Sequence, residues 1–370
     1  MGLSDSMQME HGMAYKPDFA EAVERIQAFW QRKPTGRCAL QVIARRNGAT
    51  QPPNDEVNIL TKKTDPDYVL GRAEWVFRNH HYLAEAVPIY VPGFVCTDTA
   101  AFLGAKVILA EDTVWYGPVI DDWYSYQLQF DPENRWWQMT KQMAQTATER
   151  GRGRYLVGIP DFQVPLDVVS LLRSPERLCI DLIENPDAVK AAAHLILDEV
   201  YSYCYDDIYS ILTLYTPFVG DWMGLFAAGR HDVIQCDFAA LISQRHFEEF
   251  CLPDIQRQCQ MLDTCIFHLD GPGAIRHLDM LLEIKELDAI QWVPGDGNPP
   301  AKAWLAMLKK IQCAGKCLWV SAPPEDVNAI LEELRPEGLM IHVEGTFPSL
   351  DEAEGFITAV QTTCHARWQC

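Results

Sequence analysis

The sequence predicts an α/β protein, a (β/α)8 TIM barrel with an N-terminal extension. From about residue 155 to residue 363, short strand-like runs rich in Ile, Val and Leu alternate with longer helical segments. This is the pattern of βα units around a buried parallel sheet. Several such units follow one another, which favours a closed barrel over separate domains. The alternative is a doubly wound open sheet, but no GxGxxG motif follows a strand-like run.

The N-terminal part begins with polar, Met-rich residues, so we expect a flexible leader over residues 1–16 and one barrel domain over residues 17–370. The first helix is expected from Phe19 to Trp30, because apolar residues recur there at helical spacing and Gly36 follows. Between residues 40 and 155 the short apolar runs are interrupted by Pro and Gly, and the pattern is mixed.

The remaining elements follow in strand–helix pairs. Strand-like runs cover residues 155–159, 233–238, 265–270, 289–293, 317–321 and 339–344. The helical segments that follow them cover residues 188–212, 245–262, 274–284, 301–314, 325–334 and 351–363.

Composition excludes several classes of protein. The 370 residues carry a formal charge of −20, and binding to nucleic acid or to anionic lipid needs clustered Lys and Arg, so we expect neither partner. No apolar run reaches the ~18 residues of a membrane span, and no signal peptide precedes the first helix. The 12 cysteines are irregularly spaced without a CxxC pair, which is typical of a reducing compartment. We therefore expect a cytoplasmic enzyme.

A barrel carries its active site at the C-terminal ends of its strands, so polar residues that end an apolar run are the candidates. The most informative pair is His268-x-Asp270, because residues two apart on a strand point to the same side. An imidazole and a carboxylate at that place can hold a metal or act as an acid/base pair. The alternative is a core histidine beside an aspartate that caps the next helix.

Further candidates end the neighbouring runs. Asp221 and Asp237 are candidate catalytic acids or bases, although either can simply open a turn. Trp222, Cys236 and His342 adjoin such strand ends and are candidate substrate contacts.

A resemblance to a known family rests on three segments. Residues 268–277 read HLDGPGAIRH, residues 287–295 read LDAIQWVPG, and residues 236–238 read CDF. With these segments the chain resembles the uroporphyrinogen decarboxylase superfamily over residues 39–363. The resemblance implies a TIM barrel. It also implies a homodimer, because relatives are often homodimers. The superfamily contains porphyrinogen decarboxylases, which use no metal, and zinc-dependent methyltransferases that move a methyl group between a corrinoid and a thiol.

The chain departs from the decarboxylases at their most specific motif. An N-terminal Arg-Gln-Ala-Gly-Arg segment holds the substrate carboxylates in those enzymes, whereas residues 41–48 read QVIARRNG here. The resemblance leaves Arg45 and Arg46 as substrate-binding candidates at a different spacing. An acidic chain with an altered arginine motif is poorly matched to a substrate with many carboxylates.

The chain departs from the methyltransferases at their metal ligands. Those relatives use a His-x-Cys pair and a later Cys, and here the matching positions are His268-x-Asp270 and Glu344. Two carboxylates and an imidazole balance a dication as two thiolates do, but they are harder ligands that also admit Mn²⁺ or Fe²⁺.

Our leading hypothesis is therefore a divalent metal, most simply zinc, held by His268, Asp270 and Glu344 for methyl transfer to or from a small molecule, with a corrinoid on a partner protein as methyl carrier. The first alternative is a metal-independent decarboxylase of a pyrrole-like carboxylate. The second is a barrel without catalysis that binds a ligand or a corrinoid protein.

Overall fold

The protein is built around a mainly parallel seven-stranded sheet. The computed structural model describes residues 12–94 and 98–368. The strand order is β2-β1-β13-β12-β11-β10-β9, and all neighbours are parallel except β1 and β2. The strands are β1 (Ala39–Arg45), β2 (His80–Ala84), β9 (His231–Gln235), β10 (Thr264–Asp270), β11 (Ala289–Val293), β12 (Cys317–Ala322) and β13 (Leu339–Val343).

The closed barrel that the sequence predicts is observed only in part. Among the described residues, the hydrogen-bonded sheet does not include all the strands. β3 (Ile89–Tyr90) pairs in parallel with β6 (Leu156–Val157), and β7 (Phe218–Gly220) pairs antiparallel with β8 (Phe226–Ala228). One parallel bridge, Gly158 with Gly220, links the β6 side to β7. These strands are only two or three residues long, and Pro88 and Pro160 beside them lack the N–H that a longer ladder needs. The observed class is a mixed α/β fold.

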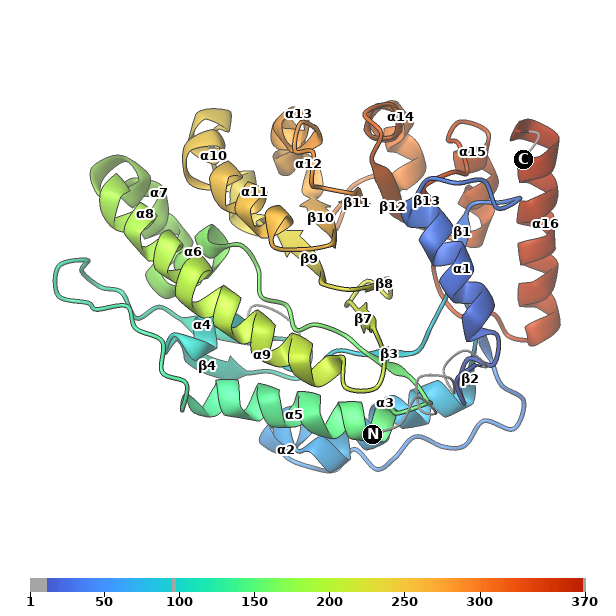
Figure 1. Cartoon of the computed structure of the whole chain (residues 1–370), viewed down its shortest axis with the longest axis horizontal. Helices are drawn as coiled ribbons and strands as arrows, with labels where there is room; N and C mark the ends of the chain where they lie inside the picture. The colour runs from blue at the N-terminus through green and yellow to red at the C-terminus, as the bar shows by residue number, and fades with distance from the viewer. Residues whose placement is uncertain (1–11, 95–97, 369–370) are drawn as a thin grey trace.

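Helices follow the parallel strands in the expected order, and in Figure 1 they succeed one another around the sheet from α10 to α16. They are α10 (Gln244–Phe250), α11 (Leu252–Gln260), α12 (Gly271–Ala274), α13 (Leu278–Leu282), α14 (Leu305–Cys313), α15 (Val327–Leu331) and α16 (Leu350–Trp368). The expected helix over residues 245–262 is divided at Cys251, because Pro253 stands in the first turn of α11 and cannot continue a preceding helix.

The other helices precede β9 in the sequence. They are α1 (Phe19–Trp30), α2 (Ile59–Thr64), α3 (Pro66–Asn79), α4 (Asp98–Phe102), α5 (Arg135–Gly151), α6 (Pro165–Arg173), α7 (Pro175–Glu184), α8 (Pro186–Leu195) and α9 (Ser202–Leu212). A π-helical turn, Ile196–Tyr201, joins α8 to α9, so the single helix expected over residues 188–212 is nearly continuous. A short hairpin, β4 (Lys106–Leu109) and β5 (Val114–Gly117), precedes α5.

Alternate residues of each strand face opposite sides of the sheet. One set, such as Leu40, Phe267 and Ile290, packs in the large core under the helices. The other set begins at the N-terminal ends of the strands with apolar residues such as Ile266 and Ala289, which pack against α1. Two residues further along, the same face becomes polar on β1, β9, β10, β11 and β13, whereas β12 carries Trp319 there. The residues there are Gln41, Gln235, His268, Gln291 and His342. This polar layer is where the candidate site lies.

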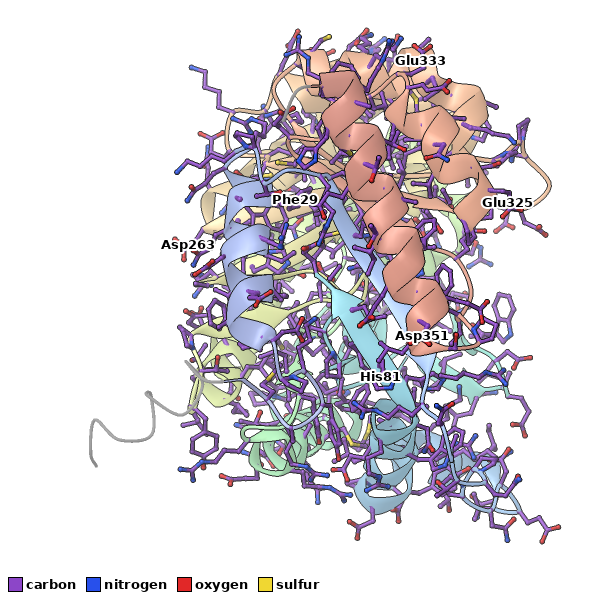
Figure 2. All side chains as sticks on the ribbon, turned by 90° about the vertical axis from the view of Figure 1, so that its right-hand side faces the viewer. Phe29, His81, Asp263, Glu325, Glu333 and Asp351 are labelled. Atoms are coloured by element: carbon purple, nitrogen blue, oxygen red, sulfur yellow. The ribbon has the colours of Figure 1, made fainter. Side chains whose placement is uncertain are left out.

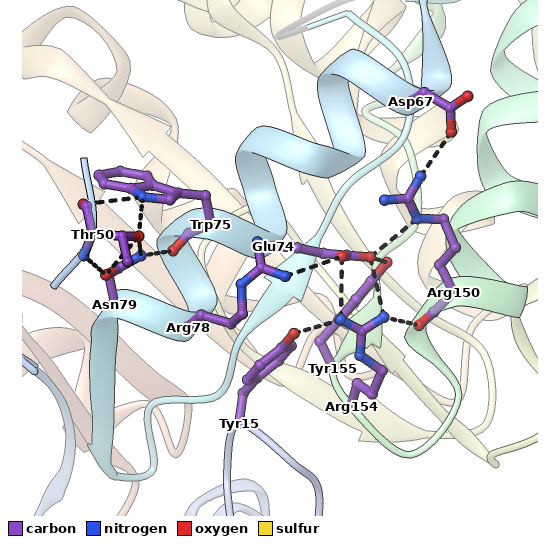
Figure 3. A network of polar contacts seen from close by, with 10 residues as sticks. All are labelled: Tyr15, Thr50, Asp67, Glu74, Trp75, Arg78, Asn79, Arg150, Arg154 and Tyr155. Atoms are coloured by element: carbon purple, nitrogen blue, oxygen red, sulfur yellow. Dashed lines mark hydrogen bonds and ion pairs between the residues drawn. The ribbon is translucent and has the colours of Figure 1, made fainter. Parts of the chain in front are cut away.

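A network of ion pairs fixes the N-terminal helices (Figure 3). Glu74 of α3 is buried, and its carboxylate accepts hydrogen bonds from Arg150 and Arg154, each at 3.1 Å. Arg154 also donates to the hydroxyl of Tyr15. The network ties the start of the described chain to α3 and to the end of α5.

The predicted leader lies mostly outside the described residues, which exclude residues 1–11. Of its remainder, Met13, Tyr15 and Lys16 are buried. The Lys16 ammonium donates to the carbonyls of Tyr82 at 3.1 Å and Ala84 at 2.8 Å, so this part of the predicted leader packs along β2. No helix in the described part of the chain is long and apolar enough to cross a membrane.

Candidate metal centre

Two carboxylates and one imidazole converge at the C-terminal ends of β9 and β10. One ligand atom from each of Asp237, His268 and Asp270 lies within 4.8 Å of the others. The strand register explains this, because Gln235 of β9 is paired with His268 of β10. Two residues further on, Asp237 and Asp270 therefore reach the same end of the sheet on the same face.

The donor set and its spacing fit a divalent metal ion. Ligand bonds of about 2.0–2.2 Å place two donors about 3–4.4 Å apart around one ion, and small side-chain rotations would bring atoms that lie within 4.8 Å of one another to that spacing. Asp270 stands before α12, but its side chain makes no capping hydrogen bond, so the helix-cap alternative is not what the structure shows.

His268 is oriented by a neighbouring strand. Its Nδ1 donates to the Oε1 atom of Gln291, a buried residue of β11 that is paired with His268 in the sheet. This contact occupies Nδ1 and leaves Nε2 as the ring nitrogen that can bind a metal. The indole of Trp222 meets the imidazole edge to face, with ring centroids 5.2 Å apart.

Asp237 is held through its backbone. The buried carboxylate of Asp167, in the first turn of α6, accepts the backbone N–H of Asp237 and that of Phe238, each at 2.8 Å. Burial, and then the charge of Asp237, raise the pKa of Asp167 well above its ordinary value. Desolvation raises the pKa of Asp237 and the nearby Asp270 adds to this, while His268 opposes it. A bound cation would relieve this repulsion between carboxylates.

A second imidazole on the same polar face is oriented in the same way. Nδ1 of His342 donates to Oε1 of Gln41 at 3.0 Å, and the Gln41 amide donates to the Met223 carbonyl at 3.0 Å. Because the amide nitrogen of Gln41 is bound to the Met223 carbonyl, the amide oxygen of Gln41 is the atom that faces His342. Burial lowers the pKa of His342, although Glu344 opposes the shift. His342 is therefore a neutral imidazole with Nε2 as an acceptor, and it stacks on Trp319.

Glu344 lies outside the group of three. Its carboxylate is exposed and accepts a hydrogen bond from the Ser321 hydroxyl at 2.9 Å. β13 is separated from β10 by β12 and β11, which is about 14 Å along a sheet. Of the three residues predicted as ligands, the structure brings together His268 and Asp270, and it supplies Asp237 in the third place.

Asp221 was predicted as a pocket acid, but the structure buries it in a turn. Its Oδ1 atom accepts the backbone N–H groups of Met223 and Leu225, at 2.8 and 2.9 Å. Its Oδ2 atom lies 3.0 Å from Nε2 of the buried His231. These contacts shape the turn between β7 and β8 and leave Asp221 1% exposed. Trp222, the next residue, does lie at the site, because its indole contacts the imidazole of His268.

Cys236 faces away from the metal candidates. It lies between Gln235 and Asp237, and the strand alternation turns its side chain into the core under the helices, beside Cys251. The sequence indicated only that it stood near a strand end.

Arg45 and Arg46 line a separate cavity of about 320 Å³ beside β2 and the start of α16. His81 and Asp351 share its wall, and Figure 2 shows these two residues near the N-terminal end of α16. Asp237, His268 and Asp270 do not line this cavity.

Comparisons with known proteins give the fold. No family model matches the chain, and no curated protein sequence matches it either. A solved structure described as a methyltransferase from Methanosarcina mazei is similar, with 14% sequence identity and a TM-score of 0.57. The alignment covers 92% of this chain and 98% of that chain. At this identity the likeness shows a shared fold.

The residues that position the site were not predicted from the sequence. Gln41 and Gln291 orient the two imidazoles, and Asp167 holds the backbone of Asp237. Amides carry no charge signature, but each glutamine stands two residues after a buried apolar residue on the same face of its strand. For Asp167 the sequence offered only a weak indication, which was an acidic residue in the first turn of the helix that begins at Pro165.

Proposed function

We propose that this protein is a metal-dependent methyltransferase whose metal is held by Asp237, His268 and Asp270. The observation that carries the proposal is the convergence of these three donors, with Nδ1 of His268 bound to Gln291 so that Nε2 is left to face a metal. The fold shared with a methyltransferase supports the reaction class. Zinc is the simplest ion, and the two carboxylates also suit Mn²⁺ or Fe²⁺.

When bound, the ion supplies Lewis acidity that lowers the pKa of a substrate hydroxyl or thiol. The protein's own groups bind and orient the substrate. Trp222 forms an apolar wall beside His268, and His342 offers Nε2 as an acceptor for a substrate N–H or O–H. Asp167 keeps Asp237 at the end of β9, since both backbone N–H groups there are bound to it. The methyl carrier we propose is a corrinoid on a partner protein.

We also propose that the fold is a (β/α)8 barrel of the uroporphyrinogen decarboxylase type. The short strands β3, β6 and β7 would complete the wall of this barrel beside the seven-stranded sheet. The bridge between Gly158 and Gly220 supports this, because neither glycine has room for a side chain there. A Cβ on Gly158 would lie 2.9 Å from the Gly220 carbonyl oxygen, and one on Gly220 would lie 2.7 Å from Ile89. The comparisons give no support to the decarboxylase alternative.

Metal binding is tested first. Protein purified without chelator is analysed for metals, and the stripped protein is titrated with Zn²⁺ by calorimetry. We expect about one ion per chain, lost in His268→Ala and in Asp270→Asn. Glu344→Gln is the matched control, because Glu344 is a carboxylate on the same face that lies outside the group. Equal loss in Glu344→Gln and His268→Ala would contradict our assignment of ligands.

Methyl transfer is tested with methylcobalamin as donor and 2-mercaptoethanol or phenol as acceptor. The Co–CH₃ bond breaks, the corrinoid keeps the electron pair, and the acceptor exchanges its proton for the methyl group. The change in corrinoid absorbance measures the rate. We expect turnover with metal and none in His268→Ala. A metal-free protein with full activity would refute the mechanism, and binding of methylcobalamin without turnover would favour the non-catalytic alternative.

A further inference from the structure

A second cavity, of about 520 Å³, opens at the other end of the strands. Lys316 directly precedes β12, Arg335 and Glu337 precede β13, and all three line it together with Arg32 and Trp368. Asp237 and Asp270 stand at the C-terminal ends of their strands, so the length of the sheet separates this cavity from the candidate metal centre.

The backbone at Arg32 is unusual for an arginine. Arg32 follows the end of α1 with φ +51°, in the left-handed region where glycine is the usual residue. Gly338 stands opposite with φ +69°, and a Cβ on it would lie 2.7 Å from Cγ of Arg32. The chain thus keeps an arginine where a glycine fits better and a glycine where the arginine needs room. This favours a role for the guanidinium itself.

Basic residues outnumber acidic residues in the lining of the cavity. Arg32, Lys316 and Arg335 face a single lining carboxylate, that of Glu337. The positive charges of Lys316 and Arg32 also act on Asp288, where burial raises the pKa of the carboxyl and these two charges oppose that shift. A surplus of cations around one cavity stands out in a chain with a net charge of −20.

The wall of the cavity is also held in place. The amide of Gln312 donates to the Arg335 carbonyl at 2.8 Å and accepts the Arg335 N–H at 3.1 Å. The Lys316 ammonium donates to the Leu287 carbonyl at 2.7 Å and to that of Ile284. Both basic residues therefore have fixed backbone or side-chain positions before any ligand arrives.

We propose that this cavity binds a phosphorylated small molecule, with Arg32 and Arg335 as the groups that contact the phosphate oxygens. Guanidinium groups match phosphate with paired N–H donors. The volume falls in the range of small-molecule sites, and Trp368 offers an apolar wall for the organic part of the ligand. The ligand of this site is distinct from the methyl acceptor, since the two sites lie at opposite ends of the sheet.

Calorimetric titration and thermal unfolding with pyrophosphate and with ATP test the proposal. Both probes should bind saturably and raise the melting temperature, and Arg335→Gln should weaken binding at least tenfold. Arg32→Gly should weaken binding as much, yet its melting temperature without ligand should equal or exceed that of the wild type, because glycine relieves the backbone strain. A purely structural Arg32 would lower stability when replaced.

Two controls make the outcome decisive. Arg245→Gln removes an exposed arginine of α10 outside the cavity and should leave binding unchanged. His268→Ala should also leave binding unchanged, which excludes phosphate bound at the metal centre. The proposal is overturned if neither probe binds saturably, if Arg245→Gln weakens binding as much as Arg335→Gln, or if His268→Ala abolishes it.

Discussion

Replacing Gln291 by Leu tests how the site orients its histidine. Gln291 is 2% exposed, and its Oε1 atom accepts the Nδ1 proton of His268. Leu has a similar size but no acceptor, so Nδ1–H loses its partner and the imidazole loses the contact that fixes its tautomer. Loss of such outer contacts lowers metal affinity about 10- to 100-fold. At about 1.4 kcal/mol per tenfold, the expected cost is about 1.4–2.7 kcal/mol of binding free energy.

The assay is calorimetric titration of the stripped protein with Zn²⁺, beside urea unfolding to check that the variant is folded. Gln235→Leu is the matched control, because Gln235 is equally buried and paired with His268 across the sheet, but its amide donates to Asp161. We expect Gln235→Leu to bind Zn²⁺ as the wild type does. If both variants lose affinity equally, or if Gln291→Leu loses none, the orientation of His268 by Gln291 is not what prepares the site.

Two further predictions concern stability. Burial raises the pKa of Asp254 to about 6, so this carboxyl stabilises the fold fully only at low pH, and the contribution is lost as pH rises through 6. Asp254→Asn should therefore raise the free energy of unfolding by about 3 kcal/mol at pH 7.5 and by about half as much at pH 5, measured by urea unfolding; an equal gain at both pH values would contradict this. Gly158→Ala should destabilise the protein by about 1–3 kcal/mol, because the added Cβ meets the Gly220 carbonyl. In the control Gly71→Ala, the Cβ enters open space in α3 and should stabilise by about 0.5–1 kcal/mol; thermal unfolding compares the two variants.

The sequence was sufficient for the regular half of the fold. The strand expected over residues 289–293 is β11 as observed, and the helix expected from Phe19 to Trp30 is α1. In both segments the local apolar period and the final packing agree. The short strands β3, β6 and β7 were not predictable in the same way. With two or three residues each, their pairing depends on contacts made far along the chain, and the prolines beside them disrupt any local pattern.

The site was predictable only where its residues share one strand. His268 and Asp270 are two residues apart, so the strand period alone places them together. Asp237 joins them because Gln235 is in register with His268, and a register between two strands is not written in either strand alone. Glu344 occupies the corresponding end of β13, and the sequence could not tell that two strands would separate it from β10. Asp221 ends a short strand but is bound by its own turn.

The two ends of the sheet carry groups of opposite charge, and our two binding proposals rest on them. At the C-terminal ends, burial raises the pKa of Asp237, and the neighbouring charge of Asp270 adds to this shift. At the N-terminal ends, Arg32 and Arg335 surround a cavity with one carboxylate. Like charges held close together cost stability, so a ligand of opposite charge would offset that cost at each of the two proposed sites. Zn²⁺ and pyrophosphate should therefore raise the melting temperature additively, since the bound ligands share no residue and are separated by the length of the strands.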